Sequence, residues 1–218
     1  MDLMVIADNM PAYLAGFRLT AQLTLVSGAG ALVIGLAVAA MRVSPLGSLR
    51  AFGAVYTELL RNMPLTLIFF FAVLVLPQFG VVLPFGYWTA IICLTAYTSA
   101  FVAEAVRSGI NAVGIGQAEA ARAIGLTFGQ SLTSVILPQA VRSVIPPLIN
   151  VIIALAKNTS VAAGFAVVEL VATGRRLAQQ NPGDVMLLLV GVAVFYLLFT
   201  IPAGQLANLL ERKVAFAR

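Results

Sequence analysis

Four stretches without a charged residue organise this chain. They lie at positions 19–41, 62–103, 143–156 and 185–210 and hold 23, 42, 14 and 26 residues. A helix needs about 20 consecutive apolar residues to cross the hydrocarbon core of a bilayer. Stretches of this length therefore predict helices that span a membrane.

The lengths of these stretches predict five spans. The first and last stretches each suit one span, and the 42-residue stretch suits two, separated by turn-forming residues at Pro77, Gly80, Pro84 and Gly86. The 14-residue stretch covers only about 21 Å at 1.5 Å per residue, so its span must include polar residues at both ends. We expect spans near 16–41, 52–76, 86–107, 134–157 and 185–208.

The composition agrees with a membrane protein. Hydrophobic residues make up 61% of the 218 residues and charged residues 10%, whereas soluble proteins average about 45–50% apolar and about 25% charged residues. The single cysteine, Cys93, and the absence of histidine favour neither a disulfide, a metal site nor hydrolytic catalysis. We expect one all-α integral membrane domain over 1–218, without catalytic or metal-ligating residues.

The basic residues predict the orientation. With five spans the two termini lie on opposite sides, and nine basic residues fall on one side, namely Arg42, Arg50, Arg61, Arg107, Arg122, Arg142, Arg212, Lys213 and Arg218. The other side holds four, namely Arg18, Lys157, Arg175 and Arg176. Cytoplasmic loops are enriched in Lys and Arg. We therefore expect a cytoplasmic C-terminus and an outside N-terminus, and we assign the net charge of +5 to orientation rather than to nucleic-acid binding.

Residues 108–135, on the predicted cytoplasmic side, are rich in alanine and other small residues. Gln117 to Ile124 predicts a short helix, Gly125 a break, and the residues up to Pro138 a second amphipathic piece. Such a helix–turn–helix is suited to docking against another protein. An alternative is a helix lying on lipid headgroups.

A spaced motif in this segment resembles a known signature. Glu119, Ala120, Ala121 and Gly125, followed by VILP at 135–138, are similar to the EAA signature of the permease subunits of ABC importers, with Val135 where isoleucine is usual. Four further stretches resemble the branch that imports polar amino acids, and these are RNMPL at 61–65, EAVRSGI at 104–110, ILPQAVRSVIPPLIN at 136–150 and LAKNTSVA at 155–162. MRVSPL at 41–46 and YTSAFVAEAVRSGI at 97–110 are similar to actinobacterial glutamate-uptake permeases.

This resemblance implies several partners. Two permease chains would form the path in the bacterial plasma (inner) membrane, with a homologous second chain favoured over an identical one. Two cytoplasmic ATPases would bind ATP and magnesium, and an extracytoplasmic binding protein would deliver the amino acid. The EAA segment would couple this chain to the ATPase through Glu119, Ala120, Ala121, Gly125, Leu137 and Pro138.

The chain itself lacks a phosphate-binding loop. Such a loop ends in Gly-Lys-Ser or Gly-Lys-Thr, and neither lysine, Lys157 or Lys213, follows a glycine. We expect no cofactor in this chain. Glu119 has a second interpretation, because a carboxylate in the first turn of a helix stabilises the positive end of the helix dipole by about 0.3–1 kcal/mol.

Polar residues within the predicted spans are candidates for the substrate path. These are Arg61, Asn62, Thr98, Ser99, Asn150, Lys157 and Asn158. Lys157 would bind a substrate carboxylate or pair with Glu169, or else extend to the outer headgroups. Arg61 fits a cytoplasmic anchor better than a path residue, and an ion pair with Glu58, three residues before it, is a further alternative. The uncharged residues would equally make contacts between helices.

The sequence thus predicts the permease subunit of an ATP-driven importer of polar amino acids, with glutamate and other acidic amino acids preferred. An ion-coupled secondary transporter is the alternative, and it would require an internal repeat and ionisable residues near the bilayer midplane. We find no repeat and only Lys157 as such a residue. A structural subunit, the third alternative, would have no ATPase partner.

Overall fold

The computed structural model describes the backbone of residues 4–214 and the side chains of residues 4–210. All regular elements in this part of the chain are helical, which confirms the predicted all-α class. Arg212, Lys213 and Arg218, three of the nine basic residues on the predicted cytoplasmic side, lie outside the described side chains.

Four helical segments are long and apolar enough to cross a membrane. They are α2 (Met10–Arg42), preceded by the short α1 (Met4–Asp8), α5 (Tyr87–Asn111), the run Phe128–Phe165 that contains α8 (Leu137–Asn158), and α10 (Val185–Val214). They cover the first, third, fourth and fifth predicted spans. A fifth crossing depends on the segment between α2 and α5.

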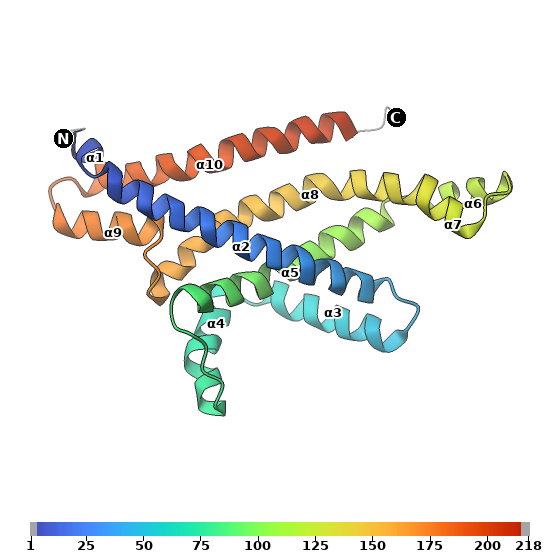
Figure 1. Ribbon diagram of the computed structural model, residues 1–218, viewed down its shortest axis with the longest axis horizontal. Helices are drawn as coiled ribbons and strands as arrows, with labels where there is room; N and C mark the ends of the chain where they lie inside the picture. The colour runs from blue at the N-terminus through green and yellow to red at the C-terminus, as the bar shows by residue number, and fades with distance from the viewer. Residues whose placement is uncertain (1–3, 215–218) are drawn as a thin grey trace.

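The second predicted span, near 52–76, is not one helix. The structure divides it into α3 (Gly47–Asn62) and α4 (Leu65–Phe70), which continues as η1 (Phe71–Val75) and η2 (Leu76–Phe79), with a bend of 105° between the two parts. Pro64 explains the break, because a proline disfavours helical backbone at the residue before it. Met63 accordingly has extended backbone, with φ −92° and ψ 138°. The helix from Leu65 onward projects away from the other helices (Figure 1).

Glycines bring α2 and α5 close together. A Cβ atom built on Gly35 would lie 2.5 Å from Val102 Cγ1 and 2.8 Å from the Ser99 carbonyl oxygen. Real Cβ atoms do not approach other atoms this closely, so only glycine fits. Glycine at position 35 therefore allows close packing of α2 against α5. Small residues have this function in many membrane helix pairs.

The two ends of the molecule carry different polar segments. One end holds the start of α2 and the helix α9 (Leu170–Gln180), and the other holds the turn from α2 to α3 and the helices α6 (Ile115–Ala123) and α7 (Phe128–Gln130) (Figure 1). The run from η3 (Ser131–Ile136) through α8 to η4 (Thr159–Phe165) returns the chain from the second end to the first. The start of α2 and the end of α10 lie at opposite ends.

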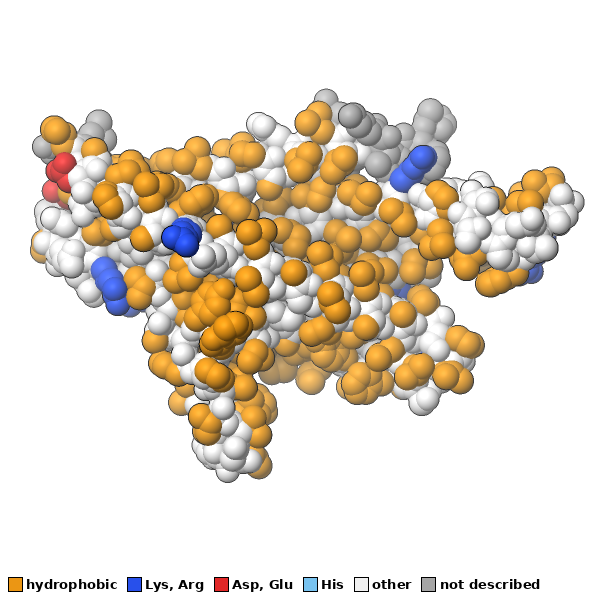
Figure 2. Space-filling view, viewed as in Figure 1, with side chains coloured by type: hydrophobic (Ala, Val, Ile, Leu, Met, Phe, Trp, Pro, Cys, Tyr) orange, Lys and Arg blue, Asp and Glu red, His pale blue; other side chains and the backbone are white. Residues whose placement is uncertain are grey.

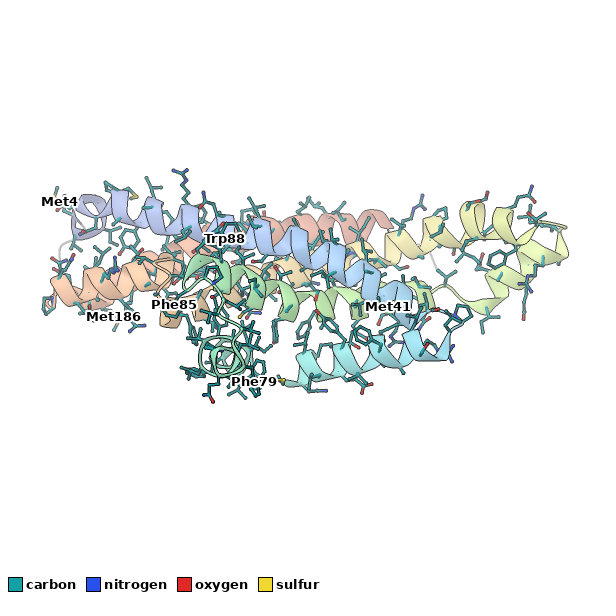
Figure 3. The ribbon with its side chains drawn as sticks, turned by 60° about the horizontal axis from the view of Figure 1, so that its bottom comes forward. Met4, Met41, Phe79, Phe85, Trp88 and Met186 are labelled. Atoms are coloured by element: carbon teal, nitrogen blue, oxygen red, sulfur yellow. The ribbon has the colours of Figure 1, made fainter. Side chains whose placement is uncertain are left out.

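Apolar side chains cover much of the outside. Leu25 and Val33 on α2 are 70% exposed, and Figure 2 shows hydrophobic side chains spread over the helices with few charges between them. In water this surface would be unfavourable, whereas lipid tails cover it without cost. Exposed aromatic residues Phe79, Phe85 and Trp88 lie around α4 and the start of α5 (Figure 3), as aromatic residues do at membrane interfaces.

Candidate functional site: a coupling segment and a polar cavity

The helix α6 ends in a turn that requires glycine. Gly125 has φ +86°, a left-handed conformation that is inexpensive only for glycine. Its amide donates to the Arg122 carbonyl at 2.9 Å, and the Leu126 amide donates to the Ala121 carbonyl at 3.1 Å. These two bonds form a Schellman motif, which satisfies the last carbonyl groups of the helix. The predicted break at Gly125 is therefore confirmed.

A capping box begins the next helix two residues later. The Thr127 hydroxyl accepts from the Gln130 amide at 3.3 Å, and the Gln130 side-chain oxygen accepts from the Thr127 amide at 2.9 Å. This arrangement satisfies amide groups at both the cap and the third helical position. Residues 125–127 therefore contain a complete stop signal and a complete start signal, which fixes the direction of the chain between α6 and α7.

Within α6 the EAA residues face in different directions. Ala121 is buried against the rest of the segment, whereas Glu119 and Ala120 are exposed. Glu119 is the fifth residue of α6 and lies outside its first turn. The interpretation of Glu119 as a partner of the helix dipole is therefore wrong, because that effect is confined to the first turn. Its exposed carboxylate is available to a partner.

Leu137 and Pro138 begin α8 beside α6, and both are exposed. The Gln139 side-chain amide donates to the Gln117 side-chain oxygen at 3.4 Å, which joins the two parts of the segment. Between them lies an open groove of about 790 Å³, lined by Gly114, Gly116, Gln117, Ser134, Val135, Pro138, Gln139 and Arg142. Val135 and Pro138, from one end of the EAA motif, line this groove, whereas Glu119, Ala120, Ala121 and Gly125 are not among its lining residues.

Several large apolar side chains of this segment are exposed. This is unusual, because the segment lies at an end of the molecule that carries polar loops. Ile115, Ile124 and Phe128 are each at least 70% exposed. Apolar side chains grouped in this way are typical of a surface that binds another protein or a membrane. Both predicted roles of the segment, docking to a protein and lying on headgroups, fit this surface.

A second cavity, of about 420 Å³, lies between α5 and α8. Its lining residues are Tyr97, Thr98, Phe101, Asn150, Val151, Ala154, Leu155 and Asn158. Three predicted substrate-path residues, Thr98, Asn150 and Asn158, therefore meet in one place. The Thr98 side chain is 3% exposed, and its hydroxyl has no hydrogen-bond partner among the described residues. A buried polar group without a partner is costly, so a hydrogen bond to a ligand that reaches this hydroxyl would be favourable.

Other predicted path residues lie outside this cavity. The Ser99 hydroxyl bonds with the Tyr56 hydroxyl at 2.7 Å and donates to the Ala96 carbonyl at 2.8 Å. Asn62 is exposed, and its amide donates to the Glu58 carbonyl at 2.8 Å. Ser99 therefore contributes to helix packing, and Asn62 caps its own helix.

Lys157 does not pair with Glu169. The Lys157 side chain is exposed and forms no ion pair within residues 4–210. The fully buried Glu169 carboxylate instead accepts from the Ala172 amide at 2.9 Å and from the Tyr196 hydroxyl at 3.1 Å. Glu169 is thus the N-cap of α9. Capping and the Tyr196 contact satisfy its oxygens without a cation.

Arg61 has a different partner from the predicted Glu58. Its guanidinium lies 3.4 Å from a carboxylate oxygen of Glu104 on α5, and it packs over the ring of Phe101 at 5.7 Å from the ring centroid. Arg42 and Arg107 bind the same carboxylate. Sequence reasoning missed Glu104 as a site residue. The sequence does contain a signal for Glu104. It is the first charged residue after 42 uncharged residues, and it lies three residues before Arg107.

Comparisons with known proteins find relatives over nearly the whole chain. Residues 31–216 match a family described as "Binding-protein-dependent transport system inner membrane component". The chain is 40% identical over 214 residues to "Probable glutamine ABC transporter permease protein GlnM" of Bacillus subtilis (strain 168), which covers 98% of both chains. It is 39% identical over 225 residues to "Glutamate transport system permease protein GluC" of Corynebacterium efficiens, with 96% of each covered.

A solved structure has the same fold. The protein described as "Crystal structure of an amino acid ABC transporter with histidines" superposes with a TM-score of 0.90 at 27% sequence identity. The superposition covers 98% of this chain and 99% of that chain. Nearly every residue of the two chains thus has a counterpart in the other chain. The superposed part includes the broken span between α2 and α5 and the projecting α4.

Proposed function

Because this chain belongs to the family of binding-protein-dependent transport system inner membrane components, we propose that glutamate and related acidic amino acids are what it carries. The chain is a permease subunit of an amino-acid ABC importer, and so a transporter component rather than an enzyme. Support for this choice of cargo comes from the 39% identity to the glutamate permease over 96% of both chains, and the 40% identity to the probable glutamine permease makes glutamine the cargo to be tested against it.

The path runs through the cavity between α5 and α8. Thr98, Asn150 and Asn158 offer a hydroxyl and two amides to the polar groups of an amino acid. The Arg61 guanidinium packs on the ring of Phe101, one of the lining residues. Arg61 supplies positive charge beside the cavity. Lys157, which is outside the cavity lining, extends its ammonium to the headgroups.

The coupling segment connects this path to the ATPases. Two partner ATPase subunits bind and hydrolyse ATP with magnesium, and their closure pushes on Glu119, Ala120 and the groove beside Pro138. Ala121 and Gly125 keep α6 in place, so the push reaches α8. Because α8 contributes Asn150 and Asn158 to the cavity, a displacement of α8 changes the cavity directly.

The end with α6 and α7 faces the cytoplasm, and the end with α9 faces outward, where an extracytoplasmic binding protein delivers the amino acid. The distribution of basic residues supports this orientation in the bacterial inner membrane. A second, homologous permease chain completes the path. The remaining apolar surface is covered by lipid.

Reconstitution tests this function. The permease is co-purified with its ATPase, placed in proteoliposomes with the binding protein, and assayed for ATP hydrolysis and uptake with a panel of acidic, neutral polar and basic amino acids. We expect glutamate to give the strongest stimulation and uptake. A preference for neutral or basic amino acids would contradict the acidic cargo, and recovery of an active carrier without an ATPase would support the secondary transporter.

Two variants test the path itself. Asn150→Ala removes an amide from the cavity, and we expect it to lower uptake while the complex still assembles. Asn62→Ala is the matched control, because it removes an amide that is exposed and outside the cavity. Equal uptake by both variants would contradict the placement of the path.

A further inference from the structure

One carboxylate on α5 is shared by three arginines from three helices. Glu104 accepts from Arg107 at 2.6 Å on one oxygen, and its other oxygen contacts Arg42 and, at 3.4 Å, Arg61. The group carries three positive charges and one negative charge. One arginine is sufficient to compensate the single negative charge, so Glu104 does not depend on all three arginines.

Arg61 is the most weakly held of the three. Its distance to Glu104 is the longest, and its side chain is 40% exposed, compared with 14% for Arg42 and 31% for Arg107. Arg42 is also fixed by a 2.9 Å hydrogen bond to the Thr57 hydroxyl. If Arg61 turns away, Glu104 keeps two close cations, so no buried charge is left without a partner.

The cavity between α5 and α8 lacks a charge of its own. Its eight lining residues include the polar side chains of Tyr97, Thr98, Asn150 and Asn158, but no Lys or Arg. Every amino acid brings at least one carboxylate, and a carboxylate removed from water requires a cation or several donors. The Arg61 guanidinium packs on the Phe101 ring, which lines this cavity, and so lies next to the cavity wall.

We propose that Arg61 is the carboxylate-binding residue of this cavity and that Glu104 is its competitor within the chain. When an amino acid occupies the cavity, Arg61 leaves Glu104 and binds the ligand carboxylate. When the ligand departs, Arg61 returns to Glu104. The inference depends on the proposed function, because it assigns the charge that holds the amino acid in that path.

The competition gives Glu104 a role in release. A carboxylate held permanently by an arginine would leave slowly, since charge-assisted bidentate pairs are among the strongest hydrogen bonds in proteins. Glu104 offers Arg61 an equivalent partner within the chain, so the ligand can leave without exposing an unpaired guanidinium. Neutralising Glu104 should therefore retain the ligand, whereas removing Arg61 should lose it.

Equilibrium binding tests this exchange. Radiolabelled glutamate is titrated onto the detergent-purified permease–ATPase complex without the binding protein. Arg61→Met should weaken binding at least about tenfold, as loss of a charged hydrogen bond implies, and Arg61→Lys should weaken it less. Glu104→Gln should tighten binding, and this gain should disappear in the double variant Arg61→Met/Glu104→Gln.

Arg50→Met is the matched control. Arg50 lies on the same helix, α3, but its guanidinium donates to the Ser44 and Pro45 carbonyls, away from Glu104. We expect it to bind glutamate as the wild-type complex does. If Glu104→Gln does not assemble, the comparison of Arg61→Met with Arg50→Met still decides, because Arg61→Met leaves Glu104 with two arginines.

Two outcomes would overturn the inference. Wild-type affinity in Arg61→Met, or weaker binding in an assembled Glu104→Gln complex, contradicts the exchange. An effect of Arg61→Met only on activation by anionic lipid, measured in nanodiscs with and without phosphatidylglycerol, would assign Arg61 to headgroups instead. Uptake by the wild-type complex separates failure of this inference from failure of the proposed function. If the wild-type complex imports glutamate normally and Arg61→Met binds glutamate normally, the exchange is refuted and the importer function stands.

Discussion

Replacing Gly125 by valine should uncouple transport from ATP hydrolysis. Gly125 has φ +86°, and a Cβ atom added there would meet no atom within 4 Å. The cost is therefore conformational and not steric. An L-residue in the left-handed region costs about 1–2 kcal/mol, and a β-branched residue is disfavoured further.

Relief of that strain would break the turn. If the backbone at residue 125 moves to negative φ, the amides of Gly125 and Leu126 lose their carbonyl partners in α6, each bond contributing about 0.5–1.5 kcal/mol. Leaving the turn therefore costs the variant these two bonds, and keeping it costs about 1–2 kcal/mol of backbone strain. The strain corresponds to a decrease of about 5- to 30-fold in the ratio of the native turn to other conformations.

The assay compares uptake with ATP hydrolysis in proteoliposomes that contain the complete complex. Gly125→Val should lower uptake per ATP hydrolysed, while insertion and helix content remain unchanged. Gly125→Asn should retain most of the uptake, because asparagine adopts left-handed backbone more readily than other residues. The defect should therefore follow backbone preference and not side-chain size.

Gly129→Val provides the matched control. Gly129 lies in the same exposed segment, and a Cβ atom there also meets no atom within 4 Å, but its φ is not positive. Both variants add the same side chain to the same surface. Wild-type uptake by Gly125→Val, or equal defects in the two valine variants, would refute the reasoning.

Three further predictions follow from other parts of the structure. Gly35→Val should prevent the close approach of α2 and α5, because its Cβ would lie 2.5 Å from Val102; overpacking of this kind costs about 1–3 kcal/mol, and a lower midpoint of thermal unfolding in detergent would show it. Lys157→Met should transport nearly as well as the wild type, because Lys157 lies outside the cavity lining; a strong uptake defect at matched expression would return it to the path. Cysteine probes at Ala120 and Gln180, both exposed, should be labelled by an impermeant thiol reagent from the cytoplasmic and the outer side respectively, and the reverse pattern would invert the orientation.

The coupling segment was accessible to sequence reasoning because its signals are local. The helix near 117–124, the break at Gly125 and the second piece beyond it are determined by residues only a few positions apart. The Schellman and capping-box contacts join neighbours in the chain. The position of Glu119 was misjudged for a local reason too, since α6 begins at Ile115, two residues earlier than expected, and Glu119 then falls beyond the first turn.

The polar contacts inside the helical bundle were not accessible in the same way. Glu58 on the same helix was one possible partner of Arg61, but Arg61 reaches Glu104 on α5. The tilt and rotation of packed helices decide which partner is nearer, and sequence spacing alone does not give these quantities. The pairing of Lys157 with Glu169, one of the alternatives for Lys157, does not form for the same reason, because Glu169 lies against Thr20 and Tyr196.

The sequence by itself determined the class of this protein, the four long apolar helices and the stop at Gly125. Hydropathy, charge spacing and the conformational freedom of glycine act along the chain and require no knowledge of distant residues. Pro64 is a signal in the sequence for a break, but it does not give the angle of 105° between the two parts. Only the tertiary structure decided that Thr98 meets Asn150 and Asn158 in one cavity. That meeting depends on how closely α2, α5 and α8 approach one another, and this is fixed by side-chain packing between helices far apart in the chain.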